Sequence, residues 1–384
     1  MINNPFFTAT EKDAQTNRRY LLGILLIGAL LRIAICFFTP LPHMHKDSWG
    51  FFSQADTLLA GGYTDYYPNG YPLIVALCKM LFGAHAESAL LWLNIGFSLF
   101  SIWFMYDIAG RLSGRASYGL LAAALLAVFP SQINYVRWLT SETPTPFFLL
   151  GAYFFYYRKQ WTWSGIFFAM AMLIRPNVAP IFVLLFIVHI LHYRKFPPML
   201  AVGLLLPLLI LGFYCKSKTG QFSVAGNSRV NILFAITASG PDVDFSMPDE
   251  HPEANTTGKA LHLYVDHIKT EPLLFLRQRL ANWWELWGFY ASSASGSRSV
   301  ASRLLLGAGN LFLLGFGLAG WWLQRRNYAV SILIIPFLVI TAVHVLLVAM
   351  PRYTYPCEAF LLLLATWALQ ALFTSRRTPQ AATA

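Results

Sequence analysis

Long apolar stretches alternate with short polar breaks from the N-terminal quarter of the chain to its C-terminus. A helix needs about 20 apolar residues to cross a hydrocarbon layer of roughly 30 Å, and most of these stretches approach that length. The pattern predicts about ten membrane-spanning helices, at residues 20–38, 90–109, 118–133, 144–157, 161–174, 178–191, 198–214, 304–323, 330–349 and 356–373. Several stretches are short, so the number of spans between residues 144 and 191 is approximate. We therefore expect an all-α polytopic membrane protein.

Two loops hold most of the remaining polar sequence within a single module of residues 1–384. The first loop, 39–87, contains an apolar run at 72–83 that is too short to span and predicts an interfacial or re-entrant helix. The second loop, 215–302, ends in a basic and tryptophan-rich segment at 273–290. Such a segment is typical of a helix that lies in the headgroup layer.

Basic residues indicate how the helices are oriented. They stand in pairs at every second break between apolar stretches: Arg18/Arg19, Arg111/Arg115, Arg158/Lys159, Arg194/Lys195, Arg325/Arg326 and Arg376/Arg377. The positive-inside rule assigns all six pairs to the cytoplasm, so the number of crossings is even and both loops face the opposite side. This placement accounts for the formal net charge of +11 without nucleic acid as a partner. With 57% hydrophobic and only 12% charged residues, the chain is not expected to fold in water.

Acidic residues are scarce, 17 in all, so the position of each is informative. Asp47 follows the first crossing, and Glu142 lies where the third crossing gives way to the fourth, on the same expected face of the membrane. Two carboxylates that share a site of low dielectric can act as a general base and its partner, because burial raises a carboxylate pKa towards the working range. The alternative is that both are ordinary solvated loop acids.

Two arginines lie on the same expected face as these acids. Arg175 stands between two apolar stretches, and Arg352 precedes Tyr353 before the last crossing. A guanidinium can bind two oxygens of a phosphate group at once, whereas a simple anchoring charge favours the cytoplasmic side. The alternative is that both side chains reach the lipid headgroups.

Metal and nucleotide chemistry receive little support from the sequence. His43 and His45 precede Asp47 at alternate positions and are weak candidates for a divalent metal, because no further Cys or Glu spacing accompanies them. Four scattered cysteines form no C-x-x-C pair. The sequence contains no phosphate-binding glycine loop, G-x-S-x-G or H-E-x-x-H motif, so a cytoplasmic nucleotide-sugar site is not indicated.

The order of these motifs resembles that of a known family. The acid-bearing loop with Asp47 and the turn Tyr67-Pro68-Asn69-Gly70-Tyr71-Pro72 are followed by Thr140-Ser141-Glu142-Thr143-Pro144, Arg175-Pro176 and Pro351-Arg352-Tyr353. This arrangement is similar to that of the GT-C membrane glycosyltransferases, and within them to the protein O-mannosyltransferase and lipid A aminoarabinose transferase group. The resemblance extends over nearly the whole chain.

The resemblance implies a GT-C-like helical bundle and an enzyme of the bacterial inner membrane with its active site facing the periplasm. Such an enzyme moves a sugar from a polyprenyl-phosphate carrier to a lipopolysaccharide, cell-surface glycan or protein acceptor, with inversion at the anomeric carbon. Asp47 matches the base of the family and Glu142 its second acid. Arg175, Arg352 and Tyr353 fall where the family places groups near the lipid-linked phosphate.

The chain departs from the pattern of the family at two places. Asp47 is followed by Ser48, where the family often has a second acid, and Tyr67 stands where a lysine is often found. Because this lysine is absent, phosphate binding must rely on other residues. The resemblance places Tyr67, Pro68 and Tyr71 in a substrate loop. No cofactor is required by the pattern, and a divalent metal is left open.

Two other functions fit parts of the pattern. A transporter or flippase for a lipid-linked sugar requires polar residues near the middle of the bilayer, and the predicted spans carry few of them. An O-antigen polymerase or ligase would depend on arginines of the large outer loop, such as Arg277 or Arg279, and on no carboxylate. The scarcity of polar residues in the spans and the clustering of candidate groups on one face favour the glycosyltransferase.

Overall fold

The structure is a computed structural model that describes residues 11–39, 44, 46–64, 66–224, 228–288 and 300–375. The α-helices in this part of the chain are α1 (Glu11–Phe37), α2 (Lys46–Leu59), α3 (Gly70–Phe82), α4 (Ala86–Ser113), α5 (Ala116–Val128), α6 (Pro130–Asn134), α7 (Pro144–Tyr157), α8 (Trp161–Ile174), α9 (Ala179–Tyr193), α10 (Pro198–Thr219), α11 (Ser228–Thr237), α12 (Met247–Glu250), α13 (Thr257–Thr270), α14 (Pro272–Leu286), α15 (Val300–Gln324), α16 (Tyr328–Ser331), α17 (Ile335–Leu346) and α18 (Tyr355–Ser375). Short 3-10 helices join or extend them: η1 (Gly83–His85), η2 (Tyr135–Arg137), η3 (Pro176–Val178), η5 (Ile332–Ile334) and η6 (Pro351–Thr354). The described residues form no β-strand beyond one isolated bridge between Ser239 and Asp242, so the expected all-α class is confirmed.

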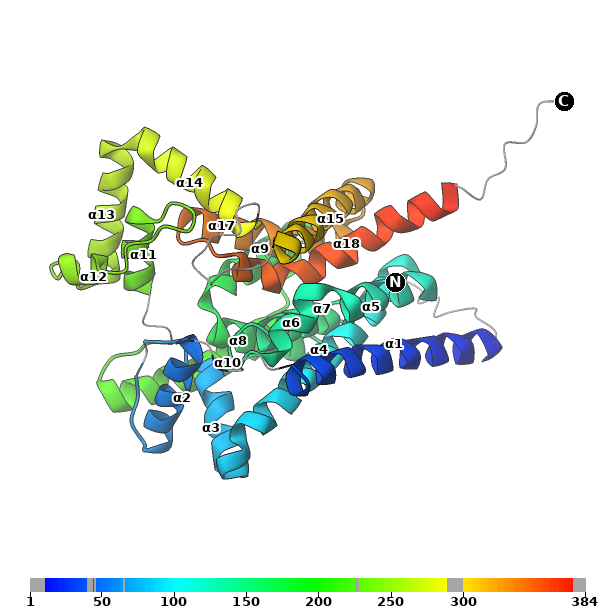
Figure 1. Ribbon diagram of the computed structural model, residues 1–384, viewed down its shortest axis with the longest axis horizontal. Helices are drawn as coiled ribbons and strands as arrows, with labels where there is room; N and C mark the ends of the chain where they lie inside the picture. The colour runs from blue at the N-terminus through cyan, green and yellow to red at the C-terminus, as the bar shows by residue number, and fades with distance from the viewer. Residues whose placement is uncertain are drawn as a thin grey trace.

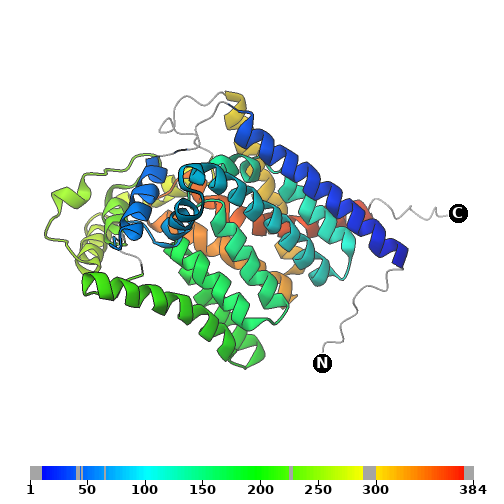
Figure 2. The same ribbon diagram turned by 90° about the horizontal axis from the view of Figure 1, so that it is seen from below.

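The long helices run side by side along one axis of the molecule (Figure 1, Figure 2). α1 begins and α18 ends at the same end of this bundle, in keeping with an even number of crossings. α2 and the group α11, α12 and α13 lie at the opposite end, which we call the loop end. The loop end therefore gathers helices from both segments that the sequence assigns to large loops.

Each predicted span corresponds to one or two helices, although fewer than ten are long and apolar enough to cross a membrane by themselves. Six helical stretches of described residues are long and apolar enough: Ala14–Phe37, Gly70–Ser113, Pro176–Tyr193, Pro198–Thr219, Tyr328–Leu346 and Pro351–Phe373. A seventh is added if α5 and α6, which meet at a bend of 59°, form one span. α7 and α8 have only 14 residues each, which is why the sequence leaves the number of spans in this region approximate.

The apolar run at 72–83 forms the separate helix α3, as the sequence suggests. A single 3-10 turn, η1, joins α3 to α4, and together they make one helical stretch of 44 residues. At 1.5 Å per residue this stretch is longer than the hydrocarbon layer is thick, so part of it must lie outside the layer. α3 packs against α2, which places it at the loop end of the stretch.

Two apolar cores hold the bundle together. The larger core joins side chains of α4, α5, α7, α8, α15, α17 and α18. The smaller core lies beneath the first loop, where Phe51 of α2 and Tyr71 of α3 pack with apolar side chains of α1, α4 and α8. The smaller core therefore fixes α2, which carries Asp47, on the ends of the long helices.

Arg32 is buried inside the bundle although it belongs to the first spanning helix. It donates to the carbonyl oxygens of Leu126 and Ala127 at 3.2 and 2.9 Å, and to the Ser98 hydroxyl at 2.7 Å. These carbonyls end α5, and Pro130 has no N–H group with which to continue the helical hydrogen bonds. Arg32 thus stabilises the bend between α5 and α6.

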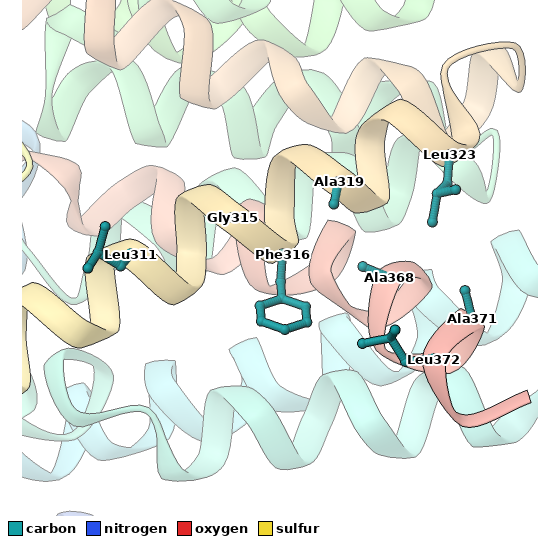
Figure 3. Close-up of a pocket in the computed structure, with 8 residues that line it drawn as sticks. All are labelled: Leu311, Gly315, Phe316, Ala319, Leu323, Ala368, Ala371 and Leu372. Atoms are coloured by element: carbon teal, nitrogen blue, oxygen red, sulfur yellow. The ribbon is translucent and has the colours of Figure 1, made fainter. Parts of the chain in front are cut away.

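An apolar groove of about 620 Å³ lies between α15 and α18 (Figure 3). Its lining consists of Leu311, Gly315, Phe316, Ala319, Leu323, Ala368, Ala371 and Leu372. None of these side chains carries a polar atom, so the groove can hold hydrocarbon but offers no group for chemistry. The candidate site must therefore be sought elsewhere.

Glycines allow two pairs of helices to pack backbone against backbone. A Cβ atom added to Gly165 of α8 would lie 2.2 Å from the carbonyl oxygen of Leu200 in α10. In the same way, a Cβ atom on Gly320 of α15 would lie 1.8 Å from the carbonyl oxygen of Leu364 in α18. Small residues at such crossings permit the close approach on which helix packing in membranes depends.

We expect Gly165→Ala to lower the melting temperature of the purified protein in detergent. The added methyl group must push α8 and α10 apart, which costs about 1–3 kcal/mol by analogy with overpacked cores. Gly96→Ala in α4 is the matched control, since nothing lies within 4 Å of its added Cβ atom. Equal changes in melting temperature for the two variants would contradict the close packing of α8 and α10.

Candidate active site

Four charged side chains from distant parts of the sequence meet at the loop end of the bundle. Arg352 Nη1 lies 2.7 Å from Asp47 Oδ2 and 3.8 Å from Glu142 Oε1, so one guanidinium joins both acids. Arg175 Nη2 lies 2.7 Å from the same oxygen of Glu142. The sequence predicts these four residues on one face, and the structure brings them together. We call Asp47, Glu142, Arg175 and Arg352 the charge cluster.

Each member of the charge cluster stands at the end of a helix. Asp47 lies in the first turn of α2, where the positive end of the helix dipole favours a carboxylate. Glu142 lies in the connection between η2 and α7, and α7 begins with a proline. Arg175 directly follows α8 and precedes a proline, and Arg352 lies in η6, which also begins with a proline. Because proline interrupts helical hydrogen bonding, Glu142, Arg175 and Arg352 lie at breaks between helices.

Water reaches the four side chains to different degrees. The exposed fraction of the side chain is 2% for Glu142, 11% for Arg175, 15% for Arg352 and 31% for Asp47. Burial by itself would raise the pKa of the Glu142 carboxyl, but the guanidinium groups of Arg175 and Arg352 outweigh it and hold the pKa below its usual value. Glu142 is therefore the buried, charged centre of the cluster, and Asp47 is its most accessible member.

Neutral neighbours limit the movement of both arginines. Arg175 Nε donates to the Ser141 hydroxyl at 3.0 Å. The guanidinium groups of Arg175 and Arg352 lie 5.7 and 5.4 Å from the ring centre of Tyr353, within the range of cation–π attraction. The His344 ring stacks on the same tyrosine with 4.3 Å between the ring centres. Tyr353 is thus in contact with both arginines and with an imidazole ring.

His344 itself is held in one orientation by two hydrogen bonds. Its Nδ1 donates to the carbonyl oxygen of Val348 at 2.9 Å, so this nitrogen carries the proton. Its Nε2 then accepts from the side-chain amide of Asn177 at 2.7 Å. Asn177 follows Arg175 by two residues, so this contact ties the end of α8 to the end of α17.

Tyr67 lies beside the charge cluster. Burial, and then the nearby Asp47 carboxylate, raises the pKa of Tyr67 to about 12, so its hydroxyl remains a hydrogen-bond donor at neutral pH. Gln54 of α2 fixes the backbone of Tyr67, donating to its carbonyl oxygen at 2.7 Å and accepting from its N–H at 3.1 Å. A Cβ atom on Gly50 would lie 2.2 Å from the tyrosine ring, so glycine is needed for this approach.

The other two residues of the predicted substrate loop are less accessible than Tyr67. Pro68 is buried, and the side chain of Tyr71 is fully buried in the smaller core against Phe51. Their part in holding a substrate therefore stays a prediction, with Tyr67 as the accessible member of the set.

No group of three or more His, Cys, Asp or Glu side chains that could hold a divalent metal comes together among the described residues. In the charge cluster, Arg352 lies between the two acids. The weak candidates His43 and His45 lie outside the described residues.

Several residues that shape the site receive no role from the sequence. Ser141 lies within the motif around Glu142 but is not singled out there, and Asn177 is signalled only by its position near Arg175. His344 lies in a span, eight residues before Arg352, and its stacking on Tyr353 depends on the break after α17. The sharing of one arginine between two acids is a tertiary contact, which no spacing in the sequence encodes.

Known proteins resemble this chain in sequence over part of its length. A family model described as dolichyl-phosphate-mannose-protein mannosyltransferase matches residues 67–214, which is less than half of the chain. The matched stretch contains Glu142 and Arg175 but neither Asp47 nor Arg352. None of the curated proteins matches the chain.

Solved structures of an oligosaccharyltransferase from Archaeoglobus fulgidus resemble this chain over most of its length. One of them is AglB in complex with an inhibitory peptide and a dolichol-phosphate, which aligns with a TM-score of 0.54 and 14% identity over 93% of this chain. The chain has a GT-C-like fold. An apo form of the enzyme gives a TM-score of 0.53 at 14% identity over 93% of this chain, and a complex with Zn and sulfate gives 0.51 at 14% over 92%.

The resemblance expected from the motif order is therefore confirmed by both comparisons, which agree on a GT-C-like protein. The likeness in structure concerns the fold, since the identity is only 14%. This GT-C-like chain spans about half the length of the archaeal oligosaccharyltransferase, because the alignment covers 51% of the AglB chain.

We expect Glu142→Gln to destabilise the GT-C-like fold more than Asp56→Asn does. The glutamine leaves two guanidinium groups without their shared buried acid, and breaking a buried ion pair costs about 3–5 kcal/mol. Asp56 pairs with Lys79 at the surface, where such a pair contributes about 0–1 kcal/mol. Thermal unfolding of the purified variants in detergent measures the difference. A melting temperature for Glu142→Gln equal to that of Asp56→Asn would show that Glu142 does not hold the cluster together.

Proposed function

We propose that the chain is a glycosyltransferase that moves a sugar from a polyprenyl-phosphate carrier to an acceptor. The observation that carries the proposal is the charge cluster, in which two acids and two arginines meet at one end of a membrane bundle. The family model and the GT-C-like fold favour the same function. AglB was solved with a dolichol-phosphate bound, and we propose a lipid phosphate of the same class for this chain.

Arg175 and Arg352 bind the phosphate of the donor in this proposal. The Nε of Arg352 is buried and has no hydrogen-bond partner among the described residues, so a phosphate oxygen would satisfy it. When the bond between the sugar and the phosphate breaks, negative charge develops on the leaving phosphate. Fixed guanidinium groups stabilise that charge in the transition state.

Asp47 is the proposed general base. In the resting site its carboxylate forms an ion pair with Arg352, with 2.7 Å between Oδ2 and Nη1. A donor phosphate competes with Asp47 for this guanidinium, and binding of the donor leaves the carboxylate able to accept a proton. The acceptor hydroxyl then forms the new bond to the anomeric carbon, its proton passes to Asp47, and the polyprenyl phosphate departs. Attack from the side opposite the phosphate inverts the anomeric carbon.

Glu142 acts on the arginines in this mechanism and not on the substrate. Its side chain is 2% exposed, and one of its oxygens lies within 3.8 Å of both guanidinium groups. It fixes the spacing between Arg175 and Arg352 and stays ionised because they lower its pKa. A phosphate that enters between the arginines therefore meets two guanidinium groups already in place.

The site is proposed to face the periplasm of a bacterial inner membrane, with a lipopolysaccharide, another cell-surface glycan or a protein as acceptor. The basic pair Arg18/Arg19 lies near the start of α1, at the end of the bundle opposite the loop end. The positive-inside rule then turns the loop end outward. Helices α11 to α14 and the loop around Tyr67 are the parts of the described chain placed to select an acceptor.

The two alternative functions find less support in the structure. Of the two arginines on which a ligase-type reaction would depend, Arg277 is exposed, whereas Arg279 is buried with both of its Nη atoms bonded to carbonyl oxygens. The buried polar residues of the spans that a transporter would need, such as Arg32 and Glu358, are hydrogen-bonded around the bend between α5 and α6. Arg279, Arg32 and Glu358 are therefore engaged in hydrogen bonds within the protein.

We expect Asp47→Asn to lower glycan transfer by about 10²- to 10⁴-fold, the usual effect of removing a general base. The protein should remain folded and in the membrane, because Asp47 is partly exposed. Mass spectrometry of lipopolysaccharide, surface glycans and envelope proteins, in a deletion strain carrying either the wild type or the variant, measures transfer and identifies the acceptor. Asp56→Asn, nine residues further along α2, should restore transfer in full. Normal glycosylation with Asp47→Asn would refute the role of Asp47.

We expect Arg175→Lys and Arg352→Lys each to weaken the binding of a polyprenyl phosphate by about tenfold. Lysine keeps the charge but cannot donate two parallel hydrogen bonds to phosphate. Binding is measured on the purified proteins in detergent. Arg158→Lys is the control, since Arg158 is paired with Asp107 at the opposite end of α7 and should bind the lipid as the wild type does. Unchanged affinity in both cluster variants would remove the arginines from the phosphate site.

A further inference from the structure

α14 is amphipathic, but its apolar face is exposed and its polar face is buried, the reverse of a surface helix in water. Its exposed face carries the apolar residues Leu273, Leu276, Leu280 and Trp284, whereas its buried face carries the polar residues Gln278, Arg279, Asn282 and Glu285. A surface helix in water normally turns its apolar face inward. The exposed face suits the lipid environment that the sequence predicts for 273–290. The buried polar face must make specific contacts, since buried polar groups without partners are costly.

Arg279, in the middle of the buried face of α14, binds the ends of two other helices. One of its Nη atoms donates to the carbonyl oxygens of Ala235 and Ala238 at the end of α11, at 2.9 and 2.8 Å. The other donates to the carbonyl oxygens of Leu346 and Leu347 at the end of α17. No carboxylate among the described residues forms a salt bridge with Arg279. The partial negative charges of two helix C-termini compensate its charge instead.

Asn282, one turn further along α14, completes the same connection. Its side-chain amide donates to the carbonyl oxygens of Val345 and Leu347, at 3.2 and 3.1 Å. Its side-chain oxygen accepts from the N–H group of Gly240, just beyond α11, at 2.8 Å. Two side chains of α14 thus satisfy the last carbonyl groups of α17, which have no helical N–H partners of their own.

The end of α17 determines where Arg352 stands. Only residues 348–351 separate Leu347 from Arg352, and α14 also packs against η6, which contains Arg352. In the last turns of α17, His344 stacks on Tyr353, the residue next to Arg352. A shift in the end of α17 would therefore be passed directly to the guanidinium that joins Asp47 and Glu142.

We propose that Arg279 and Asn282 are positioning residues, which hold the end of α17 so that Arg352 stays within reach of both acids and of the donor phosphate. Through their bonds to the end of α11, they also connect the helices of the second loop to the charge cluster. The kinetic part of this proposal rests on the proposed function, whereas its structural part does not.

The structural part is tested by thermal unfolding of the purified protein without any substrate. Arg279→Lys and Asn282→Ala are each combined with Arg352→Gln, and the changes in melting temperature are compared with the sum of the single changes. We expect a combined loss clearly smaller than the sum, because the benefit of holding α17 in place depends on Arg352. Arg277→Ala, on the exposed face of α14, should give a change that adds to that of Arg352→Gln. Additive losses for Arg279 and Asn282 would overturn the proposal.

The kinetic part separates positioning from simple loss of folded protein. Per molecule of folded protein, we expect Asn282→Ala and Arg279→Lys to lower kcat by about tenfold or more while KM for the acceptor changes little. In the Arg352→Gln background the same changes should lower kcat no further. A loss confined to the amount of folded protein, with kcat unchanged, would contradict positioning. If the wild type itself transfers no sugar, the proposed function fails, and the thermal measurement still decides whether α14 positions Arg352.

Discussion

One guanidinium, that of Arg352, is shared between two acids that come from different parts of the bundle. A buried charge is tolerated only when it is paired, so the ends of α2, α7 and α17 must meet in one arrangement for Arg352, Asp47 and Glu142 to satisfy each other. Arg175 adds the end of α8 to the same requirement. Prolines at the helix breaks create the free ends, the smaller apolar core fixes α2 upon them, and the charge cluster sets their final positions. The site and the fold of the loop end therefore depend on the same contacts.

The contact between Arg352 and Asp47 has two consequences that oppose each other. It stabilises the site in the absence of substrate, and it also occupies the carboxylate that the proposed reaction needs as a base. In the proposed mechanism, a lipid phosphate resolves this conflict by binding the guanidinium in place of Asp47. In that sequence the donor prepares the base, so proton removal from an acceptor follows binding of the donor. In the same mechanism, Asp47 stays paired with Arg352 while no donor is bound, so its carboxylate does not act as a base on the water that also reaches it.

The sequence predicts much of this arrangement because a lipid bilayer imposes simple rules on the length and orientation of the helices that cross it. The length of the apolar stretches predicts the helices, and the basic pairs predict which side of the membrane each loop occupies. Because acidic residues are scarce, Asp47 and Glu142 stand out. Motif order predicts the GT-C-like fold, which the comparisons confirm. The number of independent spans is harder to predict, because helices such as α7 and α8 are short and are covered by their neighbours in the larger core.

The contacts that hold the site in place are not predictable from spacing along the chain. Arg352 pairs with Asp47 across some 300 residues of sequence. Arg279 binds carbonyl groups, which every residue carries and no motif marks. The polar face of α14 is visible in the sequence, but a polar face normally indicates water, and here it packs against two helix ends. Tertiary structure decides which of these environments a polar side chain enters.

An experimental structure of the protein in a lipid nanodisc with a bound polyprenyl phosphate is the most direct measurement. The phosphate should lie between Arg175 and Arg352, with its oxygens about 3 Å from both guanidinium groups, and Asp47 should have separated from Arg352. A phosphate bound away from these arginines, with the contact between Asp47 and Arg352 intact, would contradict the assignment of the charge cluster as the active site.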